Sequence, residues 1–129
     1  MDHPFDPLKD GFVNYCGIVI DKKGNGFCEG HCIIDERHLN PWNMAHGGLS
    51  FTMMDTVAGN AVRSLGDGSR RTLTLSSSVS FMEPVREGLA VCRANVIRSG
   101  GKIAVVEACI YDENETLLAK AAFEFYYIS

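Results

Sequence analysis

The fold is decided by a stretch that reads Asn40-Pro-Trp-Asn-Met-Ala-His-Gly-Gly-Leu-Ser-Phe-Thr-Met-Met-Asp-Thr-Val-Ala-Gly-Asn-Ala-Val62. Its apolar residues after Gly47 recur at intervals of three and four, which is the period of a helix. We therefore predict a helix from Gly47 to about Leu65. Because this helix is apolar nearly all round, it is expected to be buried on most sides. Between Gly47 and Val62 it carries a single charged residue, Asp55.

The rest of the chain is rich in β-branched and aromatic residues and is interrupted by turn residues, which indicates strands. We place these strands at 12–20, 27–34, 70–82, 89–98, 102–111 and 116–128, with a turn at 21–26. The order β-β-α-β-β-β-β predicts an α+β fold in which an antiparallel sheet of five to six strands wraps around one long central helix. One small sheet covers such a helix incompletely, so a second copy of the chain is an expected partner.

Length and composition set the class of protein. A chain of 129 residues predicts one domain over 1–129, with 1–11 as an extended or loosely helical lead-in. The net charge of −4 argues against binding nucleic acid or an anionic membrane through bulk charge. The start of the chain lacks the features of a signal peptide, and no apolar run is long enough to span a bilayer. With five widely spaced cysteines expected to stay reduced, we predict a cytoplasmic protein.

The predicted helix begins with two glycines, Gly47 and Gly48. The first N–H groups of a helix lack intrahelical acceptors and carry partial positive charge. Without side chains to shield these groups, a carbonyl or phosphate oxygen can approach them closely. A carbonyl held there is polarised as in an oxyanion hole. The alternative is that the two glycines only relieve crowding between the helix and the sheet.

Asp55 is the second feature of this helix that points to chemistry. Aspartate is a poor residue for a helix interior, and burying it without a partner is costly. It is therefore a candidate base, although it could instead cap a neighbouring loop or face solvent. Eight residues separate it from Gly47, which is roughly 12 Å along a helix axis. One substrate carbonyl can hardly reach both in one chain, so we expect them to act together across a homodimer.

The pattern Asn40, His46-Gly47-Gly48, Asp55 resembles the N-x5-H-G-G-x7-D signature of hotdog-fold acyl-CoA thioesterases, specifically the phenylacetate-degradation (PaaI-like) group. The likeness extends over roughly 12–127 and includes the strand that ends in Met-Glu-Pro84. It implies a hotdog fold that dimerises edge to edge. It also implies hydrolysis of an acyl-CoA thioester to a carboxylic acid and free CoA, without a cofactor or metal.

The resemblance also assigns roles to residues. Gly47 would offer its N–H to the thioester oxygen, and Asn40 would position the attacking water or the thioester. Asp55 from the other protomer would be the general base or the nucleophile. His46 would shape the entry to the helix and touch the substrate.

A Ser or Thr ten residues before the strand-ending proline often assists in this family, which here is Thr74. Ser76 and Ser78 lie on the same predicted face of the strand and are alternatives to Thr74 if the register differs. Asn43 is the alternative to Asn40.

Two groups of residues outside the motif were considered as ligand sites. Arg98 and Lys102 flank the turn at 99–101 and are either solvated or in contact with the phosphates of coenzyme A. The spacing of Cys28, His31 and Cys32 is reminiscent of a metal site. On a strand, however, the two cysteines are about 13 Å apart and His31 faces the other way, so no metal is predicted.

The sequence therefore predicts an acyl-CoA thioesterase that forms a homodimer or a homotetramer. The alternative is a non-catalytic acyl-CoA-binding or sensing module on the same fold. Phe51, Met53, Met54 and Trp42 either form an apolar or aromatic acyl pocket or belong to the core.

Overall fold

The computed structural model describes residues 11–129, so the predicted lead-in lies outside the described residues except for Gly11. The elements follow in the order α2 (Phe12–Cys16), β1 (Ile18–Gly24), β2 (Phe27–Ile34), η1 (Glu36–His38), α3 (Gly47–Arg63), β3 (Thr72–Phe81), β4 (Gly88–Ser99), β5 (Ile103–Asp112) and β6 (Leu117–Tyr127). The strands form one antiparallel six-stranded sheet in the order β1-β2-β4-β5-β6-β3. The predicted α+β fold with one long helix is confirmed.

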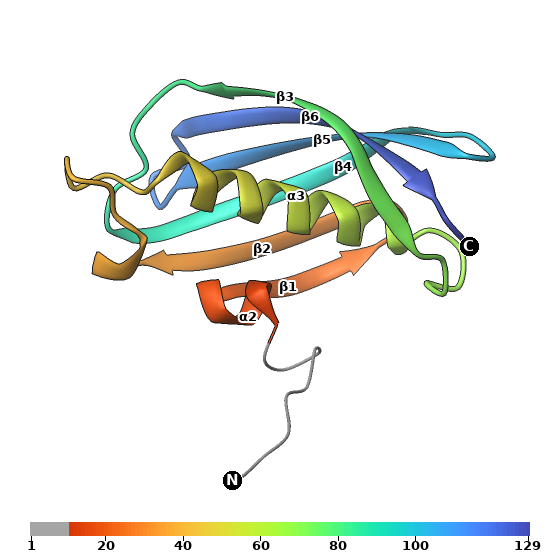
Figure 1. Ribbon diagram of the computed structural model, residues 1–129, viewed down its shortest axis with the longest axis horizontal. Coiled ribbons are helices and arrows are strands. Elements are labelled where there is room, and N and C mark those ends of the chain that lie inside the picture. The colour runs from red at the N-terminus through yellow and green to blue at the C-terminus, as the bar shows by residue number, and fades with distance from the viewer. Residues whose placement is uncertain (1–10) are drawn as a thin grey trace, which may run out of the picture.

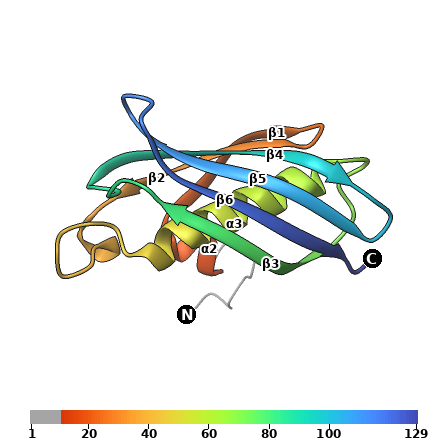
Figure 2. The same ribbon diagram turned by 90° about the horizontal axis from the view of Figure 1, so that it is seen from above.

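Helix α3 lies along one face of the sheet, and the sheet curves over it (Figures 1 and 2). Met53 and Val57 on the helix are fully buried, as are Ile110 on β5 and Phe123 on β6. Burying one such side chain contributes roughly 1.5–3 kcal/mol relative to leaving it in water. The helix is therefore buried against the sheet, as its nearly continuous apolar surface predicted.

The ends of α3 are fixed by different contacts. The helix begins at Gly47 as predicted but ends at Arg63, two residues before the predicted end. The Ser64 hydroxyl donates to the carbonyl of Ala61 and accepts the N–H of Gly26. The side chain of Ser64 thus joins the helix end to the turn between β1 and β2.

The first predicted strand is wrong at its beginning, because Phe12–Cys16 forms the short helix α2 and β1 starts only at Ile18. Gly17 adopts the left-handed conformation, with φ of 79°, and its N–H bonds the carbonyl of Asn14. This backbone reversal ends the helix. The carbonyl of Cys16 then accepts a hydrogen bond from the ring of His38, so a tertiary contact overrides the β propensity of this segment.

The turn that follows β1 is shorter than predicted. It consists of Asn25 and Gly26, which both have positive φ, 53° and 83°. That combination is typical of the two-residue turn that joins hairpin strands. Residues 21–24, which we predicted as turn, continue β1 instead, and β2 has the predicted bounds.

The register of β3 changes the predicted face of its hydroxyl residues. A bulge interrupts pairing between Thr74 and Ser76. Thr74 pairs with the buried Phe125 and so faces the helix side, whereas Ser76 pairs with the exposed Glu124 and donates to its carboxylate at 2.7 Å. Ser78, two residues further on, shares the outer face with Ser76. Neither serine can replace Thr74.

The cysteines follow the expectation for core thiols. Four are buried, Cys109 is half-buried, and all five are free. Burial raises the pKa of the Cys28 thiol to about 11 and that of Cys92 well above its usual value, because a thiolate is disfavoured in an apolar interior. Within residues 11–129, no helix is both long and apolar enough to cross a bilayer.

Two isoleucines on adjacent strands test the energetics of the core. Ile110 is fully buried, whereas Ile97 is 62% exposed. We expect Ile110→Ala to lower the free energy of unfolding by about 2–5 kcal/mol, because it removes buried methyl groups and leaves a cavity. The matched change Ile97→Ala is expected to cost less than about 0.5 kcal/mol. Urea unfolding at equal protein concentration measures both, and equal costs would contradict the assignment of the core.

Candidate active site

The start of α3 is held in place by His46. This residue is the N-cap, and its Nδ1 accepts the N–H of Gly48 at 2.8 Å. Its own backbone N–H bonds the carbonyl of His38 at 2.8 Å. A Cβ on Gly48 would lie only 3.0 Å from Nδ1, so this glycine is needed for the ring to approach. The N–H of Gly48, predicted to bind substrate, is instead engaged by His46.

Gly47 is the residue that presents a free donor. It is exposed, and among residues 11–129 its N–H has no hydrogen-bond acceptor. It occupies the first position of a helix of 17 residues, where the partial positive charge of the helix is greatest. The backbone N–H of Gly47 is therefore available as a donor, and its predicted role toward a substrate oxygen stays a prediction.

Asn40 organises the loop that leads to His46. Its Oδ1 accepts the N–H of Trp42 at 2.9 Å and that of Met44 at 3.2 Å, and its backbone N–H bonds the carbonyl of Met44. These bonds fix the side chain and leave its amide N–H groups as donors for a substrate. Asn43, the alternative, occupies an exposed turn position with φ of 61°.

Asp55 and Thr74 meet in the same chain. The Thr74 hydroxyl donates to Asp55 Oδ1 at 2.7 Å, which joins the middle of α3 to β3. Asp55 is half-buried and Thr74 is exposed, so the pair is accessible from outside. The hydroxyl of Thr74 thus engages one oxygen of the Asp55 carboxylate.

Arg63 is a residue near this pair that sequence reasoning missed. Its Nη1 donates to Thr72 Oγ1 at 2.8 Å, two residues before Thr74 on β3. Burial lowers the pKa of the Arg63 guanidinium, and the charge of Asp55 acts in the opposite direction. The sequence held one signal, since Gly59 in the helix interior is unfavourable and indicates a close approach.

A cavity of about 460 Å³ opens beside the helix start. It is lined mainly by apolar and aromatic groups, from Phe12, Tyr15, Cys16, Arg37, His38, His46, Gly48, Leu49 and Thr52. The aromatic rings come from α2, which the sequence analysis predicted as a strand. Of the residues considered for an acyl pocket, Met53 and Met54 are core and Trp42 is 73% exposed, and none of these three lines this cavity.

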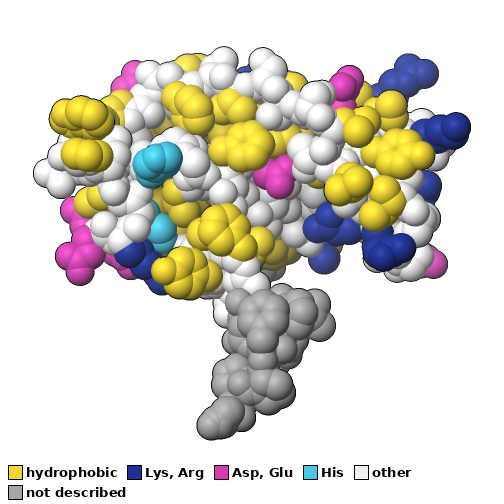
Figure 3. Space-filling view, in the orientation of Figure 1, with side chains coloured by type: hydrophobic (Ala, Val, Ile, Leu, Met, Phe, Trp, Pro, Cys, Tyr) yellow, Lys and Arg dark blue, Asp and Glu magenta, His cyan; other side chains and the backbone are white. Residues whose placement is uncertain are grey.

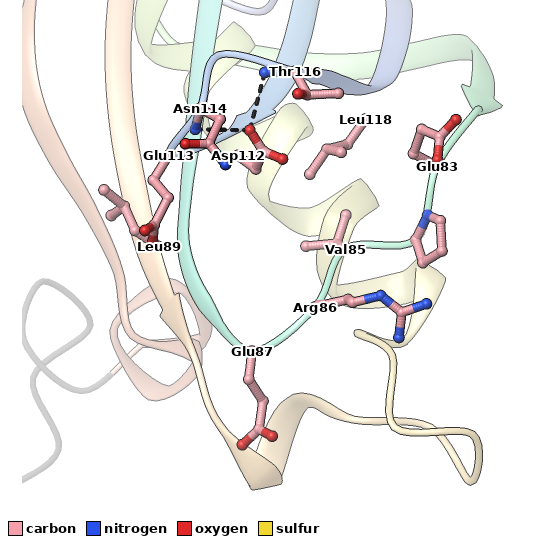
Figure 4. Close-up of a pocket in the computed structure, with 11 residues that line it drawn as sticks. Glu83, Val85, Arg86, Glu87, Leu89, Asp112, Glu113, Asn114, Thr116 and Leu118 are labelled. Atoms are coloured by element: carbon pink, nitrogen blue, oxygen red, sulfur yellow. Dashed lines mark hydrogen bonds between the residues drawn. The ribbon is translucent and has the colours of Figure 1, made fainter.

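A second cavity, of about 540 Å³, lies between the β3–β4 connection and the β5–β6 turn (Figure 4). Its charged groups are the carboxylates of Glu83, Glu87, Asp112 and Glu113 together with Arg86. Asp112 is engaged locally, because its Oδ1 accepts the N–H groups of Asn114 and Thr116. A site with this excess of negative charge does not suit a phosphate.

Arg98 and Lys102 lie at the other end of the molecule. They flank the β4–β5 turn, which lies at the end of the sheet where α3 ends (Figure 1). Gly26 links the end of α3 to β4, because its N–H donates to the Ser64 hydroxyl and its carbonyl accepts the N–H of Val96. Lysine and arginine side chains gather at this end of the visible face (Figure 3). Within one chain, the structure does not bring these two residues to Gly47, because the 17-residue helix spans about 25 Å.

His31 and His38 are both hydrogen-bonded. His31 bonds Asp21 at 2.7 Å, and the buried His38 bonds the carbonyl of Cys16 at 2.7 Å. His31 lies on the other face of β2 from the buried Cys28 and Cys32, as predicted, so these three side chains do not converge. No group of three or more potential metal ligands was found among the residues that the structure describes.

Comparison with known proteins places the chain in a family. Residues 43–119 match the thioesterase superfamily model. A Saccharolobus solfataricus protein that is provisionally named an esterase is 31% identical over 113 residues, which cover 88% of this chain and 75% of that protein. The chain therefore belongs to the thioesterase superfamily, and its class is thioester hydrolase.

Solved structures agree with the predicted fold. A thioesterase from Haemophilus influenzae is 26% identical with a TM-score of 0.84, over 91% of this chain and 82% of the other. The PaaI protein from the phenylacetic acid degradation operon of Escherichia coli has a TM-score of 0.88 at 22% identity, over 95% and 87% of the two chains. The likeness to PaaI confirms the hotdog fold.

The two glycines at the helix start should respond differently to a methyl group. A Cβ on Gly48 would meet the His46 ring at 3.0 Å, whereas a Cβ on Gly47 would reach only Phe81, at 3.6 Å. We expect Gly48→Ala to be less stable than Gly47→Ala by about 1 kcal/mol, the usual cost of losing an N-cap bond. Urea unfolding of the two variants measures the difference. Equal stability would show that the cap bond contributes little.

Proposed function

We propose that this protein hydrolyses an acyl-CoA thioester to a carboxylic acid and free CoA. Two features of one helix carry the proposal. The N–H of Gly47 has no acceptor within residues 11–129, and the carboxylate of Asp55 accepts the hydroxyl of Thr74. Two structural neighbours support the choice of thioester: one from Streptococcus mutans is bound to acetyl CoA, and a hypothetical thioesterase from Streptococcus pneumoniae is in complex with coenzyme A.

In this proposal the thioester oxygen accepts the N–H of Gly47, which polarises the carbonyl and stabilises the oxyanion that forms. Asn40 orients the thioester or the water through its amide group. Asp55 either removes a proton from water as the water adds to the carbonyl carbon, or attacks that carbon itself to give an anhydride that water then cleaves. In both routes the C–S bond breaks and CoA leaves as a thiolate, which takes the proton from Asp55 in the first route and a proton from water in the second. Thr74 holds the carboxylate throughout.

The donor and the carboxylate act in one site only if two copies of the chain combine. Helix α3 is unbroken from Gly47 to Arg63, so Gly47 and Asp55 stay roughly 12 Å apart along its axis. Each site in the proposed homodimer therefore takes Gly47 from one protomer and Asp55 from the other. A pair of such dimers gives the homotetramer, the alternative assembly.

Strand β3 is the edge through which we propose that the homodimer forms. It has no charged residue over its ten positions, and Leu73, Leu75 and Phe81 are each more than half exposed. The opposite edge, β1, carries Asp21, Lys22 and Lys23. Charge on an edge strand discourages pairing, and an uncharged apolar edge invites it.

An antiparallel β3–β3 pairing would also bring opposite ends of the two protomers together. Its two-fold axis places the basic end of one protomer beside the helix start of the other. Arg98 and Lys102 of one protomer then approach the phosphates of a CoA whose thioester lies at Gly47 of the other. The apolar cavity beside His46 accommodates the acyl group.

The activity is tested by thiol release from a panel of aliphatic and aromatic acyl-CoA esters. We expect Asp55→Asn and Asp55→Ala to lower kcat by roughly 10²- to 10⁴-fold, because the base or nucleophile is lost. Glu124→Gln is the matched control, since Glu124 also accepts a hydroxyl of β3, from Ser76 at 2.7 Å, but on the outer face. Its kcat should be unchanged.

The same panel separates the enzyme from the binding module. If the wild-type protein binds acyl-CoA tightly in calorimetry but releases no thiol from any ester, the thioesterase proposal is wrong and the binding or sensing module takes its place.

The shared site is tested by mixing two inactive variants. Gly47→Pro removes the donor N–H at a helix position that favours proline, and the ψ of 136° at His46 is compatible with a following proline. Gly47→Ala, which keeps the N–H, is its control. Co-expression of Gly47→Pro with Asp55→Ala leaves one intact site in each mixed dimer, so about a quarter of wild-type activity should return. A mixture no more active than its parents would show that the site is not shared.

A further inference from the structure

Two hydrogen bonds join α3 to β3. Thr74 donates to Asp55, and Arg63 donates through Nη1 to Thr72 at 2.8 Å. Thr72 and Thr74 pair with the buried Tyr127 and Phe125 of β6, so both hydroxyls point to the helix side of the sheet. The two bonds are therefore neighbours on one strand, and whatever moves Thr72 also moves Thr74.

The strand that carries these hydroxyls is paired on one side only. β3 is an edge strand, bonded only to β6. Its pairing with β6 is interrupted immediately after Thr74, by the bulge before Ser76. On the other side of Thr74 the pairing with β6 continues as far as the N–H of Ile128, which donates to the carbonyl of Arg71. There the bond from Arg63 to Thr72 adds a side-chain contact between the strand and the helix.

Gly59, one turn before Arg63 in the helix, leaves room for the guanidinium. A Cβ on Gly59 would lie only 2.9 Å from Nη1 of Arg63 and 3.4 Å from Nη2. Glycine inside a helix costs about 0.5–1 kcal/mol relative to alanine. The guanidinium lies in the space that a Cβ at Gly59 would occupy, so a side chain there would displace it.

Charge contributes as well as shape. Burial disfavours the guanidinium cation, and the carboxylate of Asp55 on the same helix favours it. On β3 the groups that contact this region are uncharged hydroxyls. Asp55 and Arg63 therefore interact through their opposite charges, and each also accepts from or donates to a threonine of β3.

We propose that Arg63 is a positioning residue, which holds β3 so that Thr74 stays bonded to Asp55. The inference rests on the proposed catalytic role of Asp55 and Thr74. Arg63 does not touch the substrate in this arrangement. It sets the direction of the carboxylate by fixing the strand that carries its hydroxyl partner.

Gly59→Ala gives the sharpest test because it leaves Arg63 in place but displaces its guanidinium. We expect kcat to fall roughly tenfold to a hundredfold with little change in KM, since a displaced catalytic group slows the chemical step. Alanine is the better helix former, so the thermal midpoint should stay level or rise. Gly24→Ala is the control, because a Cβ there meets nothing within 4 Å.

Two Arg63 variants show whether the effect passes through this side chain. Arg63→Met should lower kcat as Gly59→Ala does, and Arg63→Lys should restore part of it by donating to Thr72. The double variant Gly59→Ala with Arg63→Met should be no slower than Arg63→Met alone, because both changes remove the same contact. A kcat within twofold of wild type in Gly59→Ala or Arg63→Met overturns the proposal.

Crystal structures of Gly59→Ala and Arg63→Met supply a readout that does not need turnover. The proposal expects the distance between Thr74 Oγ1 and Asp55 Oδ1, 2.7 Å here, to exceed hydrogen-bond range in both. An intact bond in either overturns it, whatever the kinetics. If the wild-type protein hydrolyses no acyl-CoA, the proposed function fails by itself, and these distances still decide the role of Arg63.

Discussion

The burial of α3 against the curved sheet is the constraint on which the rest of the structure depends. Met53, Met54 and Val57 are fully enclosed, and they are enclosed by side chains such as Ile110 and Phe123 from the inner face of the sheet. A helix packed this closely cannot bend or shift without opening cavities in the core. Its N-terminus and its middle are therefore fixed relative to β3, and so are the chemical groups that they carry.

A rigid helix separates the two groups that the proposed chemistry needs. The free N–H belongs to Gly47, and the carboxylate belongs to Asp55, two turns further on. Because the helix holds both in place, the proposed mechanism takes one group from each of two molecules. The exposed and uncharged edge of β3 is well suited to bring that molecule close, and it also carries the threonine that holds Asp55. Assembly and catalysis would then use the same strand.

Three polar contacts around α3 hold groups at or near the proposed site in place. His46 engages the N–H of Gly48 and leaves that of Gly47 for a ligand. Thr74 engages one oxygen of Asp55, and Arg63 engages the neighbouring Thr72. In the first two contacts, one hydrogen-bonding group is occupied and its neighbour stays available, namely the N–H of Gly47 and the second oxygen of Asp55. Such support from surrounding side chains is how protein sites hold reacting groups within fractions of an ångström.

The sequence by itself determined the buried helix, the antiparallel sheet and the pattern from Asn40 to Asp55, because periodicity and local spacing record which residues share a face. It could not determine α2, since the contact between Cys16 and His38 joins residues 22 apart and overrides local propensity. Nor could it determine that Ser76 faces away from Thr74, because a bulge moves one residue out of alternation. The place of Arg63 was likewise decided only by tertiary structure, since its partner lies on a strand that folding brings beside the helix.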